Sequence, residues 1–239
     1  MSVLTLIRHG QASILADVYD CLSPLGELQA TALGEYWART GSVFDGVFSG
    51  PAKRHLHTAQ LAGAAYRKAG LAWPEPVVVA DLDEFPGEAL TRRYLPGLAA
   101  QHPRVAELAR DLGRAHGGPE HGRALELLFR AFTTMWARQE FDASEVETWQ
   151  AFNARVRRGL DGLRNSGMKG ARVAVFSSAG PTAIAVGMAH GLDPVSTLEL
   201  AWRVRNTACS EFLFSGDRFS LLSFNAVPHL GDPAQVTYR

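Results

Sequence analysis

The chain has 239 residues, of which 46% are hydrophobic and 20% charged, a balance typical of a soluble globular protein rather than a disordered or membrane-embedded one. Its 24 Lys and Arg residues equal its 24 Asp and Glu residues, so the sequence predicts no nucleic-acid partner and no membrane partner. Cys21 and Cys209 are too few for a disulfide framework, the apolar run Val3 to Ile7 is too short for a signal peptide, and a cytoplasmic protein is expected.

Strands and helices are predicted to alternate along most of the chain. Ser23 and Pro24 are typical of a helix start, and Gly41 of a helix end. In chain order, we expect a strand at 2–7, a helix at 24–40, a strand at 47–49, a helix at 52–68, a strand at 77–80, a helical insertion at about 90–141, a helix at 144–163, a strand at 172–177, a helix at 181–190, and a hairpin of strands 210–214 and 219–224 that turns at Gly216 and Asp217.

This alternation predicts an α/β fold with a mainly parallel central sheet and helices on both faces. We expect a single domain over 1–239 that carries the helical insertion. Ligands of such sheets bind beyond the carboxyl ends of the strands. Four polar residues stand at such ends and should converge there: His9, Ser49, Asp81 and Ser178.

His9 is the first candidate for chemistry. A neutral imidazole is a good nucleophile near pH 7, and Gly10 allows the backbone to come close to a neighbour. Phosphoryl transfer depends largely on positioning and on cationic hydrogen-bond donors, and the guanidinium of Arg8 is such a donor. Alone, this tripeptide is a weak signal, because a histidine at a strand end is more often structural.

Its context strengthens the signal. The run Leu4 to Gly10, followed by Gln11, resembles the opening motif of the histidine phosphatase superfamily, the phosphoglycerate mutase-like proteins. Further segments resemble the family's motifs in the same order: Leu22 to Gly26 with Gln29 and Ala30; Ser49 to Pro51 with Arg54, Thr58 and Ala59; and Leu82 to Glu84. The resemblance implies that His9 is the nucleophile, Arg54 a phosphate ligand and Glu84 the proton donor, with Glu88 as the substitute if the loop register differs.

The fourth motif departs from the family. After its most apolar strand the family has a histidine that donates a hydrogen bond to the phosphoryl group, and Ser178 occupies that position here. A serine hydroxyl can still donate one hydrogen bond, and the following helix offers backbone N–H groups, so Ser178 and Ala179 join Arg8, Gln11 and Arg54 as predicted substrate ligands.

Another histidine could replace the missing one. His57 is the nearest candidate by spacing, because it lies three residues after Arg54 on the same predicted helix face, although a surface or packing role is commoner. His55 is expected to point elsewhere. His229 resembles part of a C-terminal family motif in which its role is structural.

The favoured hypothesis is therefore a phosphatase that hydrolyses a phosphate monoester through a phosphohistidine on His9. Its expected partner is a small phosphorylated substrate, with no metal and no cofactor, and a homodimer remains open. A mutase would need a second phosphate subsite that the sequence does not specify. A serine hydrolase is disfavoured because Phe176 stands where its nucleophile elbow needs glycine.

Two further alternatives stay open. A non-catalytic or weakly active phospholigand-binding protein of the same fold is the main rival, because Ser178 replaces the second histidine. Arginines of the insertion could select a polyanionic substrate, but a solvated helix face is the commoner explanation. These arginines are Arg92, Arg93, Arg104, Arg110, Arg114 and Arg123.

Overall fold

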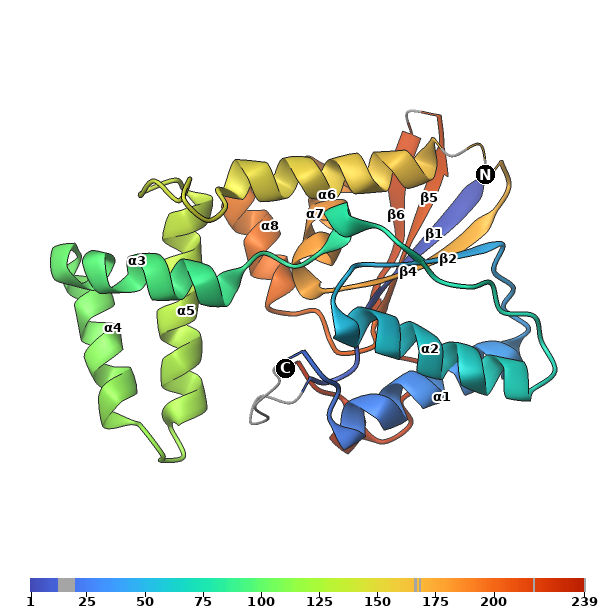
Figure 1. The fold of residues 1–239 in the computed structure, drawn as a ribbon, viewed down its shortest axis with the longest axis horizontal. Helices are drawn as coiled ribbons and strands as arrows, with labels where there is room; N and C mark the ends of the chain where they lie inside the picture. Colours follow the sequence, from blue (N-terminus) through green and yellow to red (C-terminus); the bar gives the residue numbers. More distant parts are fainter. Residues whose placement is uncertain (13–19, 166, 168, 217, 239) are drawn as a thin grey trace. The chain divides into compact units, whose positions relative to one another are not determined.

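The computed structural model describes residues 1–12, 20–165, 167, 169–216 and 218–238 of the chain (Figure 1). The chain divides into two compact units. The first comprises Met1–Glu84 and Ala154–Arg239, and the second comprises Phe85–Asn153. The segment 90–141, predicted to be a helical insertion, falls wholly within the second unit.

The first unit is built on one mixed sheet, which has six strands within the described residues. Its strands β3, β2, β4 and β1 are mutually parallel, and β5 and β6 add an antiparallel edge beside β1. In spatial order the strands are β3 (Val77–Val78), β2 (Gly46–Ser49), β4 (Arg172–Ser177), β1 (Ser2–Arg8), β5 (Cys209–Ser215) and β6 (Arg218–Ala226). The predicted mainly parallel sheet is confirmed.

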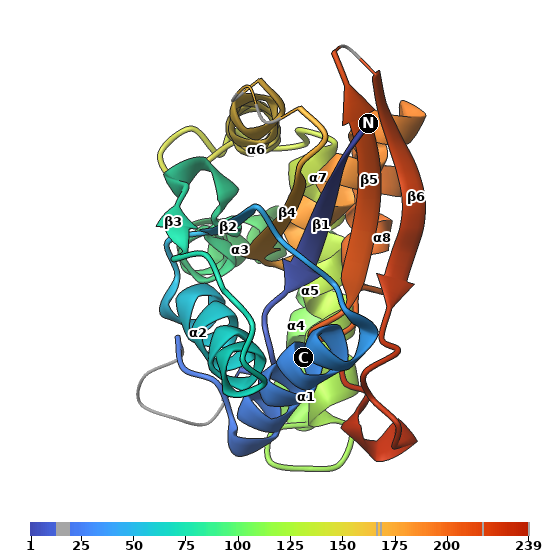
Figure 2. The same cartoon turned by 90° about the vertical axis from the view of Figure 1, so that its right-hand side faces the viewer.

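Helices cover both faces of this sheet, as predicted (Figure 2). Helices α1 (Pro24–Thr40) and α2 (Lys53–Lys68) pack on one face, where Ile7 and Phe176 of the central strands join Trp37 in a buried apolar cluster. Helices α7 (Ala179–His190) and α8 (Pro194–Ala201) lie on the other face. The central strands are buried from both sides, which explains their nearly continuous apolar sequence.

Local sequence signals explain the best-predicted boundaries. Ser23 caps α1 by accepting a hydrogen bond from Gly26 N at 3.1 Å, and Gly41 ends it with a φ of 67°, a left-handed conformation that favours glycine. Gly216, at the predicted hairpin turn, also has a positive φ of 55°. Asp217, its predicted turn partner, lies outside the described residues.

Other predicted boundaries were wrong. Strand β3 ends at Val78 and gives way to a 3₁₀ turn, Ala80–Leu82. Helix α6 (Trp149–Arg164) begins five residues later than predicted, because residues 144–146 form a turn and residues 147–148 are irregular. Helix α7 begins at Ala179 instead of 181. Helix α8 was missed, although Asp193 is an N-cap signal whose carboxylate accepts from Val195 N and Ser196 N.

The second unit is helical. It contains α3 (Gly87–Gln101), α4 (Pro103–Arg114) and α5 (His121–Ala137). Aromatic side chains supply much of its interior, and the ring centroids of Phe85 and Trp136 lie 5.1 Å apart.

Candidate active site

His9 directly follows β1, and its side chain is almost fully buried. Its Nδ1 lies 2.6 Å from the carbonyl oxygen of Gly10. Because a carbonyl oxygen can only accept, Nδ1 carries the proton of the neutral ring, and Nε2 is left with its lone pair. The backbone is also fixed, since Asn206 Nδ2 donates to His9 O at 3.1 Å and Gly10 N donates to Thr58 Oγ1 at 3.1 Å. The site therefore presents Nε2 as the basic atom.

The loop after His9 lies very close to the start of α1. A Cβ added at Gly10 would stand 2.4 Å from Gly26 O, and one added at Gly26 would stand 2.1 Å from Gln11 O. Both distances are far shorter than a van der Waals contact, so both positions need glycine. The side chain of Gln11, a predicted substrate ligand, turns toward α1, where its Oε1 accepts from Ser23 Oγ at 2.8 Å.

Burial and neighbouring charges keep His9 neutral. Burial is the main cause that lowers the pKa of His9 well below 6.5, and the positive charges of Arg8 and Arg54 add to it. The hydrogen bond to Gly10 opposes this shift without reversing it. The imidazole of His9 is therefore unprotonated at neutral pH.

Arg54 lies in the first turn of α2, the helix that follows β2, and its guanidinium extends toward His9 and Ser178. Its Nη1 donates to Asp20 Oδ1 at 2.8 Å, and its Nη2 lies 3.5 Å from Ser178 Oγ. Asp20 also accepts from the backbone N of Lys53, at 2.8 Å, and therefore caps α2. Asp20 was not predicted as a site residue, because nothing in the sequence between His9 and Asp20 indicates that its carboxylate contacts Arg54.

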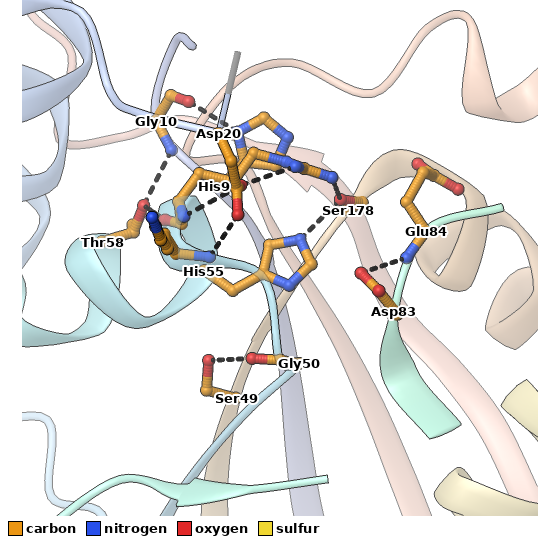
Figure 3. Close-up of polar contacts among 12 residues, drawn as sticks. His9, Gly10, Asp20, Ser49, Gly50, His55, Thr58, Asp83, Glu84 and Ser178 are labelled. Carbon is orange, nitrogen blue, oxygen red and sulfur yellow. Dashed lines mark hydrogen bonds and ion pairs between the residues drawn. The ribbon is translucent and has the colours of Figure 1, made fainter. Parts of the chain in front are cut away.

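His55 corrects a prediction. It was expected to point away from the site, but it is fully buried and its Nε2 lies 2.6 Å from Ser178 Oγ (Figure 3). Its ring centroid is 5.6 Å from that of His9. Burial, followed by the charge of Arg54, lowers the pKa of His55 to about 3. His57, the candidate chosen from spacing, is only half-buried, and its side chain makes no hydrogen bond within the described residues.

Glu84 also lies at the strand ends. Its Oε2 accepts from the backbone N of Gly180 at 3.0 Å, in the first turn of α7, which begins with Ala179. The loop that carries it is held by Arg155, whose Nη2 donates to Glu84 O at 3.0 Å. Figure 3 shows Glu84 and His55 on different sides of Ser178. The first turn of α7, where an anion was expected to bind, thus already receives one carboxylate.

Arg8 is oriented differently from the other predicted ligands. Its Nη1 donates to the carbonyl oxygens of Val204 and Tyr238, the latter at 2.7 Å. The guanidinium therefore ties the end of β1 to the C-terminal segment, while its charge still acts on His9. Its predicted contact with a phosphoryl group stays a prediction.

His9, Arg54 and Ser178 lie close together at the carboxyl ends of the strands, whereas Arg8 and Gln11 have other partners. The histidine phosphatase superfamily (branch 1) matches the chain over residues 4–110 and 98–227. The chain belongs to the histidine phosphatase superfamily. No curated protein matches its sequence significantly.

Solved structures of other histidine phosphatase-like proteins share its fold. Phosphoglycerate mutase from Bacillus anthracis has a TM-score of 0.62 at 18% identity, with 95% of this chain and 94% of that chain covered. Phosphoserine phosphatase from Entamoeba histolytica, in complex with 3-phosphoglyceric acid, has a TM-score of 0.60 at 20% identity, with 96% and 100% covered. α-Ribazole phosphatase from Shigella flexneri has a TM-score of 0.58 at 19% identity, with 94% and 96% covered. Identities this low establish the fold and leave the substrate open.

The remaining candidates are held by partners of their own. Glu88, the substitute acid, belongs to the second unit and is paired with Arg92 at 3.6 Å, where both side chains are largely exposed. Arg93, Arg104 and Arg114 likewise form exposed ion pairs with carboxylates of their own unit, as a solvated helix face would. His229 Nε2 lies 2.8 Å from Thr207 Oγ1, and burial lowers its pKa to about 4.

Metal-binding clusters and membrane-spanning helices are both absent from the described part of this chain. Within the described ranges, no group of three or more His, Cys, Asp or Glu side chains could hold a metal ion. None of the helices in that part of the chain combines the length and the apolar character that a membrane crossing requires.

Proposed function

We propose that the chain is a phosphatase that hydrolyses a small phosphate monoester through a phosphohistidine formed on His9 Nε2. The observation that carries the proposal is the state of that imidazole. The hydrogen bond from Nδ1 to Gly10 O, at 2.6 Å, leaves the lone pair on Nε2, and burial keeps the ring unprotonated. A buried, neutral and oriented imidazole is a nucleophile that needs no separate base.

Groups that would stabilise a transferred phosphoryl group surround this nucleophile. Arg54 supplies a permanent positive charge, and Ser178 supplies a hydroxyl within 3.5 Å of the Arg54 guanidinium. Glu84 stands beside Ser178, at the first turn of α7, and is the carboxyl group available to the leaving oxygen. The Asp20 carboxylate orients Arg54 through their 2.8 Å ion pair.

The reaction has two steps. First, His9 Nε2 forms a bond to phosphorus as the bond from phosphorus to the ester oxygen breaks, and Glu84 transfers its proton to the departing oxygen. Second, the oxygen of a water molecule bonds to phosphorus as the bond from phosphorus to His9 Nε2 breaks, Glu84 takes up a proton from that water, and inorganic phosphate leaves. Glu84 regains in the second step the proton that it gave in the first, and His9 loses the phosphoryl group that it accepted. Both side chains are thus regenerated, and no cofactor is consumed.

A panel of phosphorylated metabolites together with p-nitrophenyl phosphate tests this function. We expect hydrolysis by the wild type, an acid-labile phosphoenzyme in a rapid acid quench, and the loss of both in His9→Ala. An unchanged rate in His9→Ala would overturn the mechanism. Retained binding of inorganic phosphate with no hydrolysis of any ester would instead identify a phospholigand-binding protein.

The same panel addresses the mutase alternative. A mutase returns the phosphoryl group to a substrate, so its product would be an isomer of the starting ester. A phosphatase releases inorganic phosphate in an amount equal to the ester consumed. Quantifying both products by phosphorus NMR separates the two activities.

A further inference from the structure

His55 is a buried imidazole that the mechanism above does not use. It lies in the first turn of α2 and is fully enclosed. Its Nε2 is 2.6 Å from Ser178 Oγ, while its buried Nδ1 has no hydrogen-bond partner among the described residues. The fold accommodates the ring closely, since a Cβ added at Gly50 would stand 2.5 Å from His55 Nδ1.

Packing alone gives little reason for a histidine here. Leaving one buried ring nitrogen without a partner costs free energy that an apolar side chain would avoid. The other buried positions of α2 near the strand ends carry small residues such as Thr58 and Ala59. A polar ring at this position therefore points to a use for its other nitrogen, which contacts Ser178.

The hydrogen-bonding capacity of Ser178 suggests that use. Its hydroxyl has one proton to donate and two lone pairs that accept. The guanidinium of Arg54, at 3.5 Å from Ser178 Oγ, can only donate. If His55 Nε2–H also donates, both lone pairs are occupied, and the hydroxyl proton is free to point at a bound anion. In the other tautomer Ser178 would donate to His55 and turn a lone pair toward that anion, which is unfavourable.

We propose that His55 is a positioning residue that donates from Nε2 to Ser178 Oγ and so directs the Ser178 hydroxyl proton toward the phosphoryl oxygens. The inference rests on the proposed function, because it assigns His55 a part in holding the same phosphoryl group. His55 acts only through Ser178 and touches no substrate. The pair thereby places an oriented donor beside Arg54.

Four variants test the arrangement: His55→Leu, His55→Gln, Ser178→Ala and the double variant His55→Leu/Ser178→Ala. Loss of one oriented donor costs on the order of a hundredfold in kcat, so His55→Leu and Ser178→Ala should each lose about that much. Because His55 acts through Ser178, the double variant should be no slower than Ser178→Ala alone. His55→Gln keeps an N–H donor at similar reach and should stay within about tenfold of the wild type.

His57→Leu is the matched control, since it removes an imidazole from the same helix without touching Ser178. It should leave kcat unchanged. Thermal melting of every variant shows which of them fold, and His55→Gln and Ser178→Ala carry the test if His55→Leu does not. The proposal is overturned if His55→Leu keeps the wild-type kcat, if its loss multiplies with that of Ser178→Ala, or if His55→Gln is as slow as His55→Leu.

Vanadate binding separates this inference from the proposed function. Calorimetry with vanadate needs no turnover, and it should show weaker binding in His55→Leu and Ser178→Ala with the same lack of additivity. If the wild type binds vanadate but hydrolyses no ester, the proposed phosphatase function fails while the role of His55 is still decided by the binding data. If none of the variants changes vanadate affinity in that case, the role of His55 fails as well.

Discussion

The closest backbone contact near the site gives a prediction that depends on geometry alone. In Gly26→Ala the new Cβ would stand 2.1 Å from Gln11 O, whereas ordinary contact begins at 3.4 Å, so the two segments must separate by about 1.3 Å. The movement cannot be absorbed easily, because Ser23 N donates to Gln11 O at 2.8 Å and Gln11 N donates to Gln29 Oε1 at 2.9 Å. His9, two residues before Gln11, should therefore shift.

A displacement of about 1 Å at a reacting group can cost roughly a hundredfold in rate. We therefore expect Gly26→Ala to lower kcat by about that factor, although Gly26 carries no side chain and touches no substrate. The overpacking itself should lower the free energy of unfolding by about 1–3 kcal/mol. The measurements are kcat at saturating p-nitrophenyl phosphate and urea denaturation of the same samples.

Two glycine controls separate displacement of the site from general destabilisation. Gly34→Ala meets an equal obstruction, with Ala62 O 2.1 Å from its Cβ, but at the contact between α1 and α2 instead of the loop after His9. Gly162 has nothing within 4 Å of an added Cβ, so Gly162→Ala should be neutral or slightly stabilising. Equal losses of kcat in Gly26→Ala and Gly34→Ala, at equal stability, would refute the reasoning.

Four further predictions concern the pH profile, the pH dependence of stability, proton donation by Glu84 and the loop that carries Glu84. Because burial, ahead of the nearby charges, lowers the pKa of His9, the acid limb of kcat/KM should lie below pH 6.5, and a limb at or above 6.5 would contradict this. Burial lowers the pKa of His229 to about 4 in the folded state, so the unfolded state binds more protons between pH 6.5 and pH 4. The free energy of unfolding should therefore decrease as the pH falls through this window, by up to about 1.4 kcal/mol per pH unit. Urea denaturation at several pH values should show a smaller decrease in His229→Gln. Glu84→Gln should slow hydrolysis of alkyl phosphates by roughly 10²- to 10⁴-fold and that of p-nitrophenyl phosphate much less, since nitrophenolate leaves without a proton; equal losses on the two substrates would remove Glu84 as the acid. Arg155→Met removes donors to the carbonyls of residues 81, 83 and 84 and should lower the free energy of unfolding by at least about 2 kcal/mol, which denaturation with unchanged m-value would establish.

Much of the fold followed from local signals in the sequence. Strands β1 and β4 are short apolar runs that end in polar residues, and the ends of α1 are marked by Ser23 and Gly41. Since the carboxyl ends of parallel strands meet at one edge of a sheet, the sequence alone was enough to place His9 and Ser178 together.

The partners of the site residues could not be predicted in the same way. Arg8 contacts carbonyls of Val204 and Tyr238, which are far away in the sequence and carry no side-chain signal of their own. Spacing favoured His57 because residues three apart share a helix face. That argument fails in the first turn of α2, because this end of the helix points at the site and residues on any of its faces can lie beside the site. His55 is the residue that contacts Ser178.

The charges around His9 affect its protonation state both before and after substrate binds. The positive charges of Arg8 and Arg54 lower the pKa of His9, and a bound phosphate dianion would offset that part of the shift by neutralising their field. Burial, however, is the largest cause of the shift, and a ligand that excludes water from the surroundings of His9 would strengthen it. His9 should therefore stay neutral when substrate is bound. The imidazole is then a free base both before and after binding, and it can attack phosphorus without a second group to remove its proton.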